Sequence, residues 1–131
     1  MSRDLIEAAK AARLKAHAPY SKFLVGAAVR DEHGRVFGGC NIENAAYPQG
    51  WCAEPSAIAA LIMAGGRKIT EVAVIGAGAG LVTPCGGCRQ KIREFADGGV
   101  KIHVCGEDGG IKQTFTLDEL LPFSFGPEHP K

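Results

Sequence analysis

The chain has 131 residues, the usual size of one domain and enough to bury an ordinary core, so we expect a single domain over residues 1–131. Fifteen lysines and arginines against fourteen aspartates and glutamates give a net charge of +1 without a basic patch, which argues against nucleic acid as a partner. No apolar run approaches the roughly 20 residues of a membrane span and the N-terminus does not resemble a signal peptide, so we expect a cytoplasmic protein with no membrane partner.

The N-terminal third of the chain predicts a helix followed by an antiparallel hairpin. Apolar residues recur at roughly helical spacing over residues 3–17, and Pro19 closes that stretch. Two apolar runs, 24–30 and 35–40, flank a polar turn in which Gly34 can adopt a positive φ. We therefore expect one helix and then a pair of strands.

The middle of the chain predicts a loop, a second helix and a buried strand. Residues 41–50 carry turn-forming residues without periodicity, which indicates a loop close to the functional site. An apolar stripe that follows Cys52 predicts a helix ending at Gly65-Gly66, where a positive-φ cap is common. Residues 72–75 are apolar on both faces, as in a central strand covered from two sides.

The C-terminal part predicts a helix over residues 86–96, a strand over 100–105 with one better-buried face, and a short last helix over 117–121. The glycine-rich segment 76–80 lacks the spacing of a phosphate-binding loop, so we interpret it as a flexible turn. Strand, helix and strand in succession form a crossover between parallel strands. The elements together predict a mixed sheet with helices packed on it.

Two short segments carry the pattern of a metal site: Cys-x-Glu at 52–54 and Pro-Cys-x-x-Cys at 84–88, each at the start of a predicted helix. The first-turn N–H groups of a helix lack intrahelical partners and favour thiolates placed beside them. Three thiolates leave one position of a tetrahedral Zn²⁺ open, which is typical of catalytic sites. We expect one zinc ion per chain, held by Cys52, Cys85 and Cys88.

Two other interpretations of the cysteines stay open at this point. A closed structural zinc site needs a fourth ligand, and Cys40 and Cys105 are further thiols, although each stands alone at a predicted strand end and is interpreted as a core residue. A redox dithiol at Cys85 and Cys88 would leave Cys52 unexplained. The number of protein ligands on the metal distinguishes the catalytic interpretation from the structural one.

Glu54 is the candidate general base, because it stands two residues after a thiolate ligand and could point into the open metal position without binding the metal. The alternative is an acid that merely suits the positive end of a helix dipole. Pro55 fits a first helical turn, and it disfavours helical backbone at Glu54, so the helix is expected to begin at Pro55.

The chain resembles the small homotetrameric cytidine deaminases. The segments 52–54 and 84–88 match the three-cysteine form of the zinc deaminase signature. Three more segments resemble the family in the same order, namely residues 19–28, the loop 41–45, and Leu120-Leu121-Pro122 with Phe125. The resemblance implies an α/β fold, a three-layer α-β-α sandwich around a mixed five-stranded sheet.

The resemblance also implies a role for each matched residue. Phe23 would line the nucleoside pocket, and Asn41 with Glu43 would hydrogen-bond the ribose hydroxyls. Ala53 would face the base edge together with Glu54. On the residues alone, Phe23 could equally be a core aromatic, and Asn41 a turn former.

The implied activity is zinc-dependent hydrolytic deamination of cytidine and 2′-deoxycytidine to uridine and 2′-deoxyuridine, with release of ammonia, in pyrimidine salvage. Glu54 would move the protons. Tyr47 and Phe125 would reach the site of a neighbouring subunit in a homotetramer. Deamination of another aminopyrimidine nucleoside such as blasticidin S, and a non-catalytic zinc-stabilised binding module, remain as alternatives.

One position departs from the family pattern. These deaminases commonly carry arginine directly after the catalytic glutamate, and this chain has Pro55. Three thiolates exceed the charge of Zn²⁺ by one, which weakens the acidification of bound water. The two helix N-termini and Arg89, beside Cys88, are candidates for the compensating positive charge.

Overall fold

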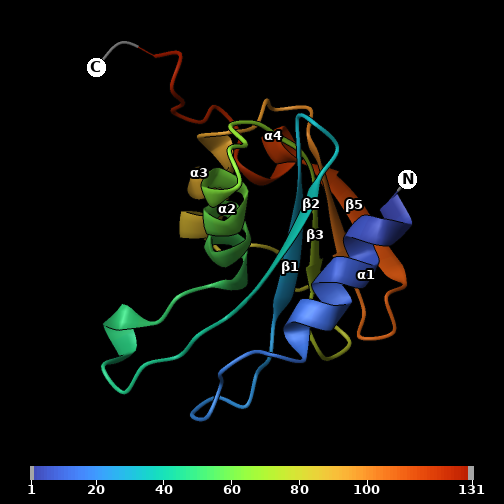
Figure 1. The fold of residues 1–131 in the computed structure, drawn as a ribbon, viewed down its shortest axis with the longest axis vertical. Helices are drawn as coiled ribbons and strands as arrows, with labels where there is room; N and C mark the ends of the chain where they lie inside the picture. The colour runs from blue at the N-terminus through green and yellow to red at the C-terminus, as the bar shows by residue number, and fades with distance from the viewer. Residues whose placement is uncertain (1, 130–131) are drawn as a thin grey trace.

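A mixed five-stranded sheet lies between two helical layers in the computed structural model, which describes residues 2–129 (Figure 1). The elements are α1 (Ser2–Arg13), β1 (Gly26–Asp31), β2 (Val36–Cys40), the 3-10 helix η1 (Tyr47–Gln49), α2 (Ala53–Met63), β3 (Ile69–Ile75), α3 (Gly86–Arg93), β4 (Lys101–Cys105), β5 (Ile111–Thr116) and α4 (Leu117–Leu120). The strand order is β2-β1-β3-β4-β5, with β3 and β4 parallel and the other neighbours antiparallel. The predicted α/β class and mixed sheet are confirmed.

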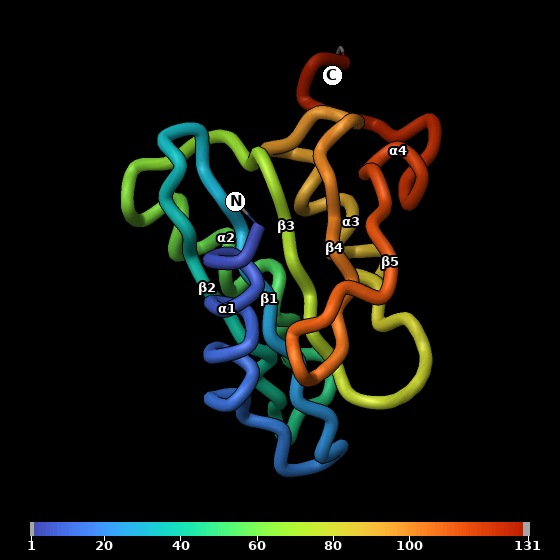
Figure 2. Tube along the Cα trace, turned by 90° about the vertical axis from the view of Figure 1, so that its right-hand side faces the viewer, coloured from blue at the N-terminus to red at the C-terminus, as the bar shows by residue number. Residues whose placement is uncertain are grey.

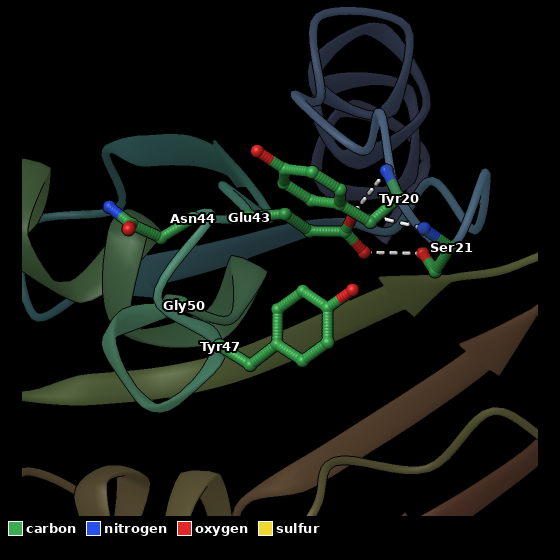
Figure 3. A pocket seen from close by; sticks show the side chains of 6 residues that line it. All are labelled: Tyr20, Ser21, Glu43, Asn44, Tyr47 and Gly50. Carbon is green, nitrogen blue, oxygen red and sulfur yellow. Dashed lines mark hydrogen bonds between the residues drawn. The ribbon is translucent and has the colours of Figure 1, made fainter.

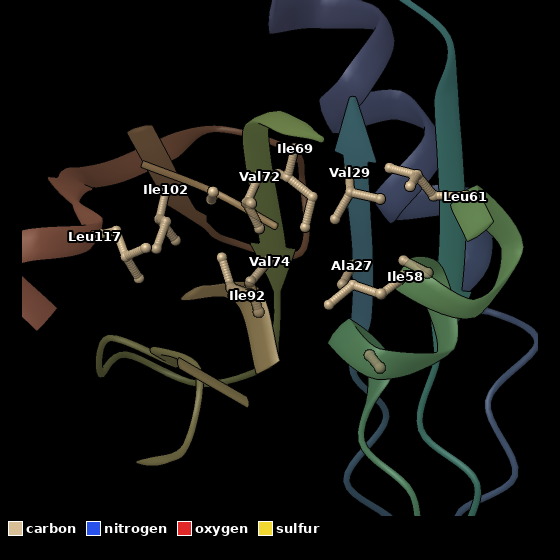
Figure 4. Packing of buried hydrophobic residues seen from close by; sticks show 13 residues of the cluster. Ala27, Val29, Ile58, Leu61, Ile69, Val72, Val74, Ile92, Ile102 and Leu117 are labelled. Atoms are coloured by element: carbon tan, nitrogen blue, oxygen red, sulfur yellow. The ribbon is translucent and has the colours of Figure 1, made fainter. Parts of the chain in front are cut away.

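Two apolar clusters attach the helices to the sheet. The larger cluster joins the sheet to α2 and α3 through side chains such as Val29, Leu61 and Ile92 (Figure 4). The smaller cluster lies on the opposite face, where α1 packs over β1 and β2 (Figure 2). Burial of each large aliphatic side chain contributes roughly 1.5–3 kcal/mol, so both layers are firmly held. The three-layer prediction is confirmed, and α2 and α3 share one face.

The first turn of α2 packs against β2 at Gly39. A Cβ atom there would lie 2.3 Å from the backbone nitrogen of Ala57 and 2.6 Å from the carbonyl oxygen of Ala53. Any residue other than glycine would push the helix off the strand. This close approach fixes the start of α2 beside the end of β2.

The predicted turns have the expected backbone. Gly34 closes the β1–β2 hairpin with a φ of 82°, and Gly65 follows α2 with a φ of 96°. The segment 76–80 forms no helix and leads through a loop to α3, as the interpretation of a turn required. Among residues 2–129, no helix is long and apolar enough to cross a membrane.

Two helices are shorter than predicted. Helix α1 ends at Arg13, four residues before the predicted end. The backbone of His17 instead pairs with the loop after β2, at Asn41 and Ile42. Helix α3 ends at Arg93 instead of Ala96. The carbonyl oxygen of Phe95 accepts a hydrogen bond of 2.8 Å from the N–H of Ile69, which diverts the chain toward β3.

The strands differ from the prediction at the C-terminal side of the sheet. The prediction of one better-buried face for β4 is wrong: Ile102 through Cys105 are all buried, because Cys105 packs under α1 and His103 is enclosed by polar partners. Strand β5 (Ile111–Thr116) was not assigned from the pattern, although the five-stranded sheet implied by the resemblance requires it.

The second helix begins earlier than predicted. It starts at Ala53 with Cys52 as the N-cap, whereas Pro55 was expected to be its first residue. Pro55 instead occupies the third helical position. Its missing N–H costs nothing there, because the first-turn N–H groups have no intrahelical acceptor.

Candidate active site

The three cysteines predicted as metal ligands lie together at two helix N-termini. Cys52 is the N-cap of α2, Cys85 is the N-cap of α3, and Cys88 lies in the first turn of α3. The Sγ atoms of Cys52 and Cys85 are 4.0 Å apart, and those of Cys85 and Cys88 are 3.4 Å apart. All three lie within 4.8 Å of one another.

This spacing fits zinc. Three sulfur atoms at about 2.3 Å from a tetrahedral Zn²⁺ lie roughly 3.8 Å apart, which the two short separations bracket. Within residues 2–129, no further histidine, cysteine or acidic side chain joins the group. Cys40 and Cys105 therefore stay outside it. Three ligands and an open fourth position agree with the catalytic arrangement and not with a closed structural site.

The thiols differ in their acidity. Burial raises the pKa of Cys52 and, more strongly, of Cys88. Burial also acts on Cys85, but hydrogen bonds with the backbone N–H of Cys88 and with the thiols of Cys88 and Cys52 outweigh it and lower the pKa of Cys85. Zinc binds only the deprotonated ligands, so its binding displaces protons from this cluster.

Glu54 is the second residue of α2 and is only 4 % exposed. Burial raises the pKa of its carboxyl group. A hydrogen bond to its own backbone, a hydrogen bond with the Cys88 thiol and the charge of Lys91 counteract that rise without reversing it. A carboxyl group whose pKa is raised above its ordinary value is better suited to accept and return protons.

A cavity of about 400 Å³ opens in front of these groups. This volume is within the range of small-molecule sites. Most of the predicted site residues line it, and they are Phe23, Asn41, Glu43, Tyr47, Cys52, Ala53, Glu54 and Cys85. The structure thus brings the loop after β2 and the starts of α2 and α3 to one cavity.

Asn41 and Glu43 hold the loop that carries Phe23. The Oδ1 of Asn41 accepts a bond of 2.9 Å from the N–H of Val25, and its Nδ2 donates to the carbonyl oxygen of Phe23 at 2.8 Å. Glu43 accepts from the N–H groups of Tyr20 and Ser21 at 3.0 and 3.1 Å and from the Ser21 hydroxyl (Figure 3). These bonds, led by the Ser21 hydroxyl, lower the pKa of Glu43.

Two predicted residues have exposed aromatic rings. Tyr47 is 73 % exposed and meets the ring of Tyr20 edge to face at 5.7 Å. Phe125 is 55 % exposed and stacks on His129 with ring centroids 5.1 Å apart. Phe125 is not among the residues that line the cavity of its own chain.

Among the described residues, the guanidinium of Arg89, one of the candidates for the compensating charge, hydrogen-bonds to oxygen atoms and not to the thiols. Its guanidinium donates to the carbonyl oxygens of Pro84 and Leu120, each at 2.7 Å, and to the hydroxyl of Thr83 at 3.0 Å. These bonds tie the segment before Cys85 to α4. Arg89 therefore fixes the backbone next to Cys85, with no hydrogen bond to the sulfur atoms among the described residues.

Sequence reasoning missed Trp51, which lines the cavity directly before Cys52. The Nζ atom of Lys91 lies 5.4 Å from the centre of its ring. An aromatic residue beside a predicted ligand was the available signal for Trp51. No sequence pattern pointed to Lys91, because its place near the site depends on how α3 packs against the start of α2.

Residues 1–104 match the family model described as the cytidine and deoxycytidylate deaminase zinc-binding region. The chain belongs to this deaminase family. A curated cytidine deaminase of Sporosarcina psychrophila is 44 % identical over 124 residues, which cover 95 % of this chain and 90 % of that protein. One from Halalkalibacterium halodurans is 40 % identical over 124 residues, with 95 % and 93 % covered.

Solved structures of the family have the same fold. The crystal structure of cytidine deaminase from Burkholderia pseudomallei superposes with a TM-score of 0.88 at 42 % identity, covering 95 % of this chain and 99 % of that chain. Cytidine deaminase from Mycobacterium tuberculosis superposes with a TM-score of 0.82 at 35 % identity, covering 94 % and 95 %. The zinc-binding region of the family and the fit of the three thiolates to zinc identify zinc as the cofactor.

Proposed function

We propose that this chain catalyses the hydrolytic deamination of cytidine and 2′-deoxycytidine to uridine and 2′-deoxyuridine, a reaction of pyrimidine salvage. The observation that carries the proposal is a buried carboxyl group, Glu54, beside three convergent thiols at a cavity large enough for a nucleoside. The cytidine deaminases to which the chain is similar support the substrate class.

The protein groups have distinct tasks in this reaction. When bound by Cys52, Cys85 and Cys88, zinc supplies a Lewis acid that lowers the pKa of water at the open position. Glu54 would accept one proton from the attacking water and deliver it to N3 of the cytosine ring while the water oxygen forms a bond to C4. Glu54 would then take the proton of the new C4 hydroxyl and pass it to the amino group, whose bond to C4 breaks to release ammonia. Its raised pKa serves both directions of transfer, and its burial keeps bulk water from competing for the proton.

Asn41 and Glu43 are proposed to bind the ribose hydroxyls. Asn41 has used one N–H of its amide, so a second remains for a hydroxyl. Glu43 accepts three hydrogen bonds, and a carboxylate can accept about four. Phe23 and Ala53 line the same cavity, which supports the proposed roles of Phe23 in the nucleoside pocket and of Ala53 at the base edge.

We also propose a cytoplasmic homotetramer formed by single-domain chains. One sheet and two clusters on its faces support the single domain. The exposed rings of Tyr47 and Phe125 support completion of the site by neighbouring subunits. Zinc binding by thiolates requires reduced cysteines, which supports a cytoplasmic location.

Absorbance spectroscopy of nucleosides incubated with the zinc-loaded protein tests the proposal. Cytidine and 2′-deoxycytidine should both be converted to the uracil products, and blasticidin S should be converted far more slowly. Conversion of blasticidin S alone would replace the proposed substrate class. Zinc binding without conversion of any of the three would favour the non-catalytic binding module.

A further inference from the structure

The candidate zinc site carries more negative than positive charge. Three thiolates leave a net charge of −1 on Zn²⁺, and an ionised Glu54 adds another. A partly buried excess charge is costly, and it opposes the loss of a proton from water at the metal. Pro55, directly after Glu54, contributes no positive charge. Besides the positive N-terminal ends of α2 and α3, a cation from elsewhere in the chain would offset the excess negative charge.

Lys91 lies where such a cation is needed. It stands on α3 three residues after Cys88, a spacing that places two side chains on the same helix face. Its Nζ lies 5.4 Å from the ring centre of Trp51, the residue before Cys52. A Cβ atom on Gly87, between the other two ligands, would lie 3.6 Å from the same Nζ. The ammonium group therefore sits between the two segments that carry all three ligands.

The other two basic side chains of α3 donate their hydrogen bonds away from the thiols. Arg89 binds backbone oxygens and Thr83, and Arg93 binds the Ser124 hydroxyl and Glu128. Lys91 forms no ion pair with an acidic side chain of residues 2–129.

We propose that Lys91 is a positioning residue whose ammonium charge offsets the excess negative charge of the three-thiolate site. Trp51 holds the ammonium group through a cation–π contact. The lysine strengthens zinc binding from outside the ligand set. This inference rests on the proposed zinc site but not on the identity of the nucleoside.

Zinc affinity tests the proposal without reference to turnover. The dissociation constant is measured by competition with a chromophoric chelator for the wild-type protein, Lys91→Met, Lys91→Arg and the control Lys101→Met. Lys101 is an exposed lysine at the start of β4, so its variant removes the same charge elsewhere. Lys91→Met should weaken zinc binding about tenfold, the lower end of what outer-shell partners of metal ligands contribute. Lys91→Arg and Lys101→Met should bind zinc like the wild type.

The salt dependence of zinc affinity distinguishes an effect of the Lys91 charge from an effect of its packing. Lys91 is exposed, so the defect of Lys91→Met should be largest at about 0.01 M salt and shrink at about 1 M, where the Debye length falls to about 3 Å. Wild-type affinity in Lys91→Met, or an equal loss in Lys91→Arg, would overturn the role of the charge. Failure of the wild-type protein to bind zinc would instead overturn the proposed function.

Discussion

Cys85 and Cys88 reach one point because both belong to the start of α3, and Cys52 joins them from the start of α2. The spacing within 84–88 made the local pair predictable from the sequence. That Cys52 meets the pair depends on α2 and α3 packing on one face of the sheet, which spacing alone does not determine. Cys52 meets the pair because Cys52 and Cys85 are the N-caps of these two neighbouring helices.

Single cysteine-to-serine variants should divide into two groups by zinc content. Serine at position 52, 85 or 88 removes a thiolate and should strip most of the metal. Cys40→Ser and Cys105→Ser should keep about one zinc per chain, because neither thiol joins the cluster. Metal analysis of the purified variants checks this. Loss of zinc in Cys40→Ser or Cys105→Ser as complete as in Cys85→Ser would indicate a closed site and remove the catalytic interpretation.

Among the elements, β3 and β4 carry a buried polar group that the sequence did not reveal. His103 is 6 % exposed and contacts Glu71 at 2.5 Å and the Thr114 hydroxyl at 2.8 Å. Burial alone would raise the pKa of Glu71, but the hydrogen bonds from Ser2 and His103 and the charge of His103 lower it. The ionised carboxylate is therefore stabilised by folding.

Glu71→Gln should lower the free energy of unfolding by about 1–3 kcal/mol at neutral pH, the range for an impaired buried hydrogen-bond partner. Because folding lowers the pKa of Glu71, its contribution is fully present above the ordinary pKa of a glutamic acid and is lost as pH falls through the lower folded value. The difference between wild type and variant in the free energy of unfolding, measured with urea, should therefore shrink as pH falls. The exposed ion-pair partner Glu107, changed to Gln, is the control and should cost less than about 1 kcal/mol. A defect in Glu71→Gln that is independent of pH would contradict this assignment.

Most elements followed from the sequence, and the exceptions have physical causes. Periodicity and the glycines at 34 and 65 located the hairpin and the end of α2. The end of α3 was overestimated, because a backbone bond from β3 to Phe95 overrides local helical spacing. Strand β5 was not assigned, since its residues are mostly exposed and lack a strong apolar alternation. Tertiary pairing determined these features, and a single sequence does not display it.

At the scale of the whole molecule, the isolated chain leaves Phe125 outside its own cavity. If it serves a neighbour, Phe125→Ala should raise the KM for cytidine about 2- to 13-fold, because a stacked ring is worth about 0.5–1.5 kcal/mol beyond area burial. Thermal stability should change little, because the ring is 55 % exposed. The KM is measured by steady-state kinetics, and the oligomeric state of the same samples is measured by size-exclusion chromatography with light scattering. Phe123→Ala, which removes a fully exposed ring from the same segment, should leave KM unchanged. A fully active monomer would contradict the shared site while leaving the zinc chemistry intact.

The most direct measurement is the turnover of cytidine by Glu54→Gln at a zinc content matched to the wild type. The amide keeps the shape of the side chain and cannot accept the proton, so zinc binding and fold should persist. Turnover should fall by about 10² to 10⁴, with the upper end expected because one residue serves several proton transfers. A variant that holds zinc and retains about a tenth of wild-type turnover, well above that range, would remove Glu54 from the reaction and contradict the proposed mechanism.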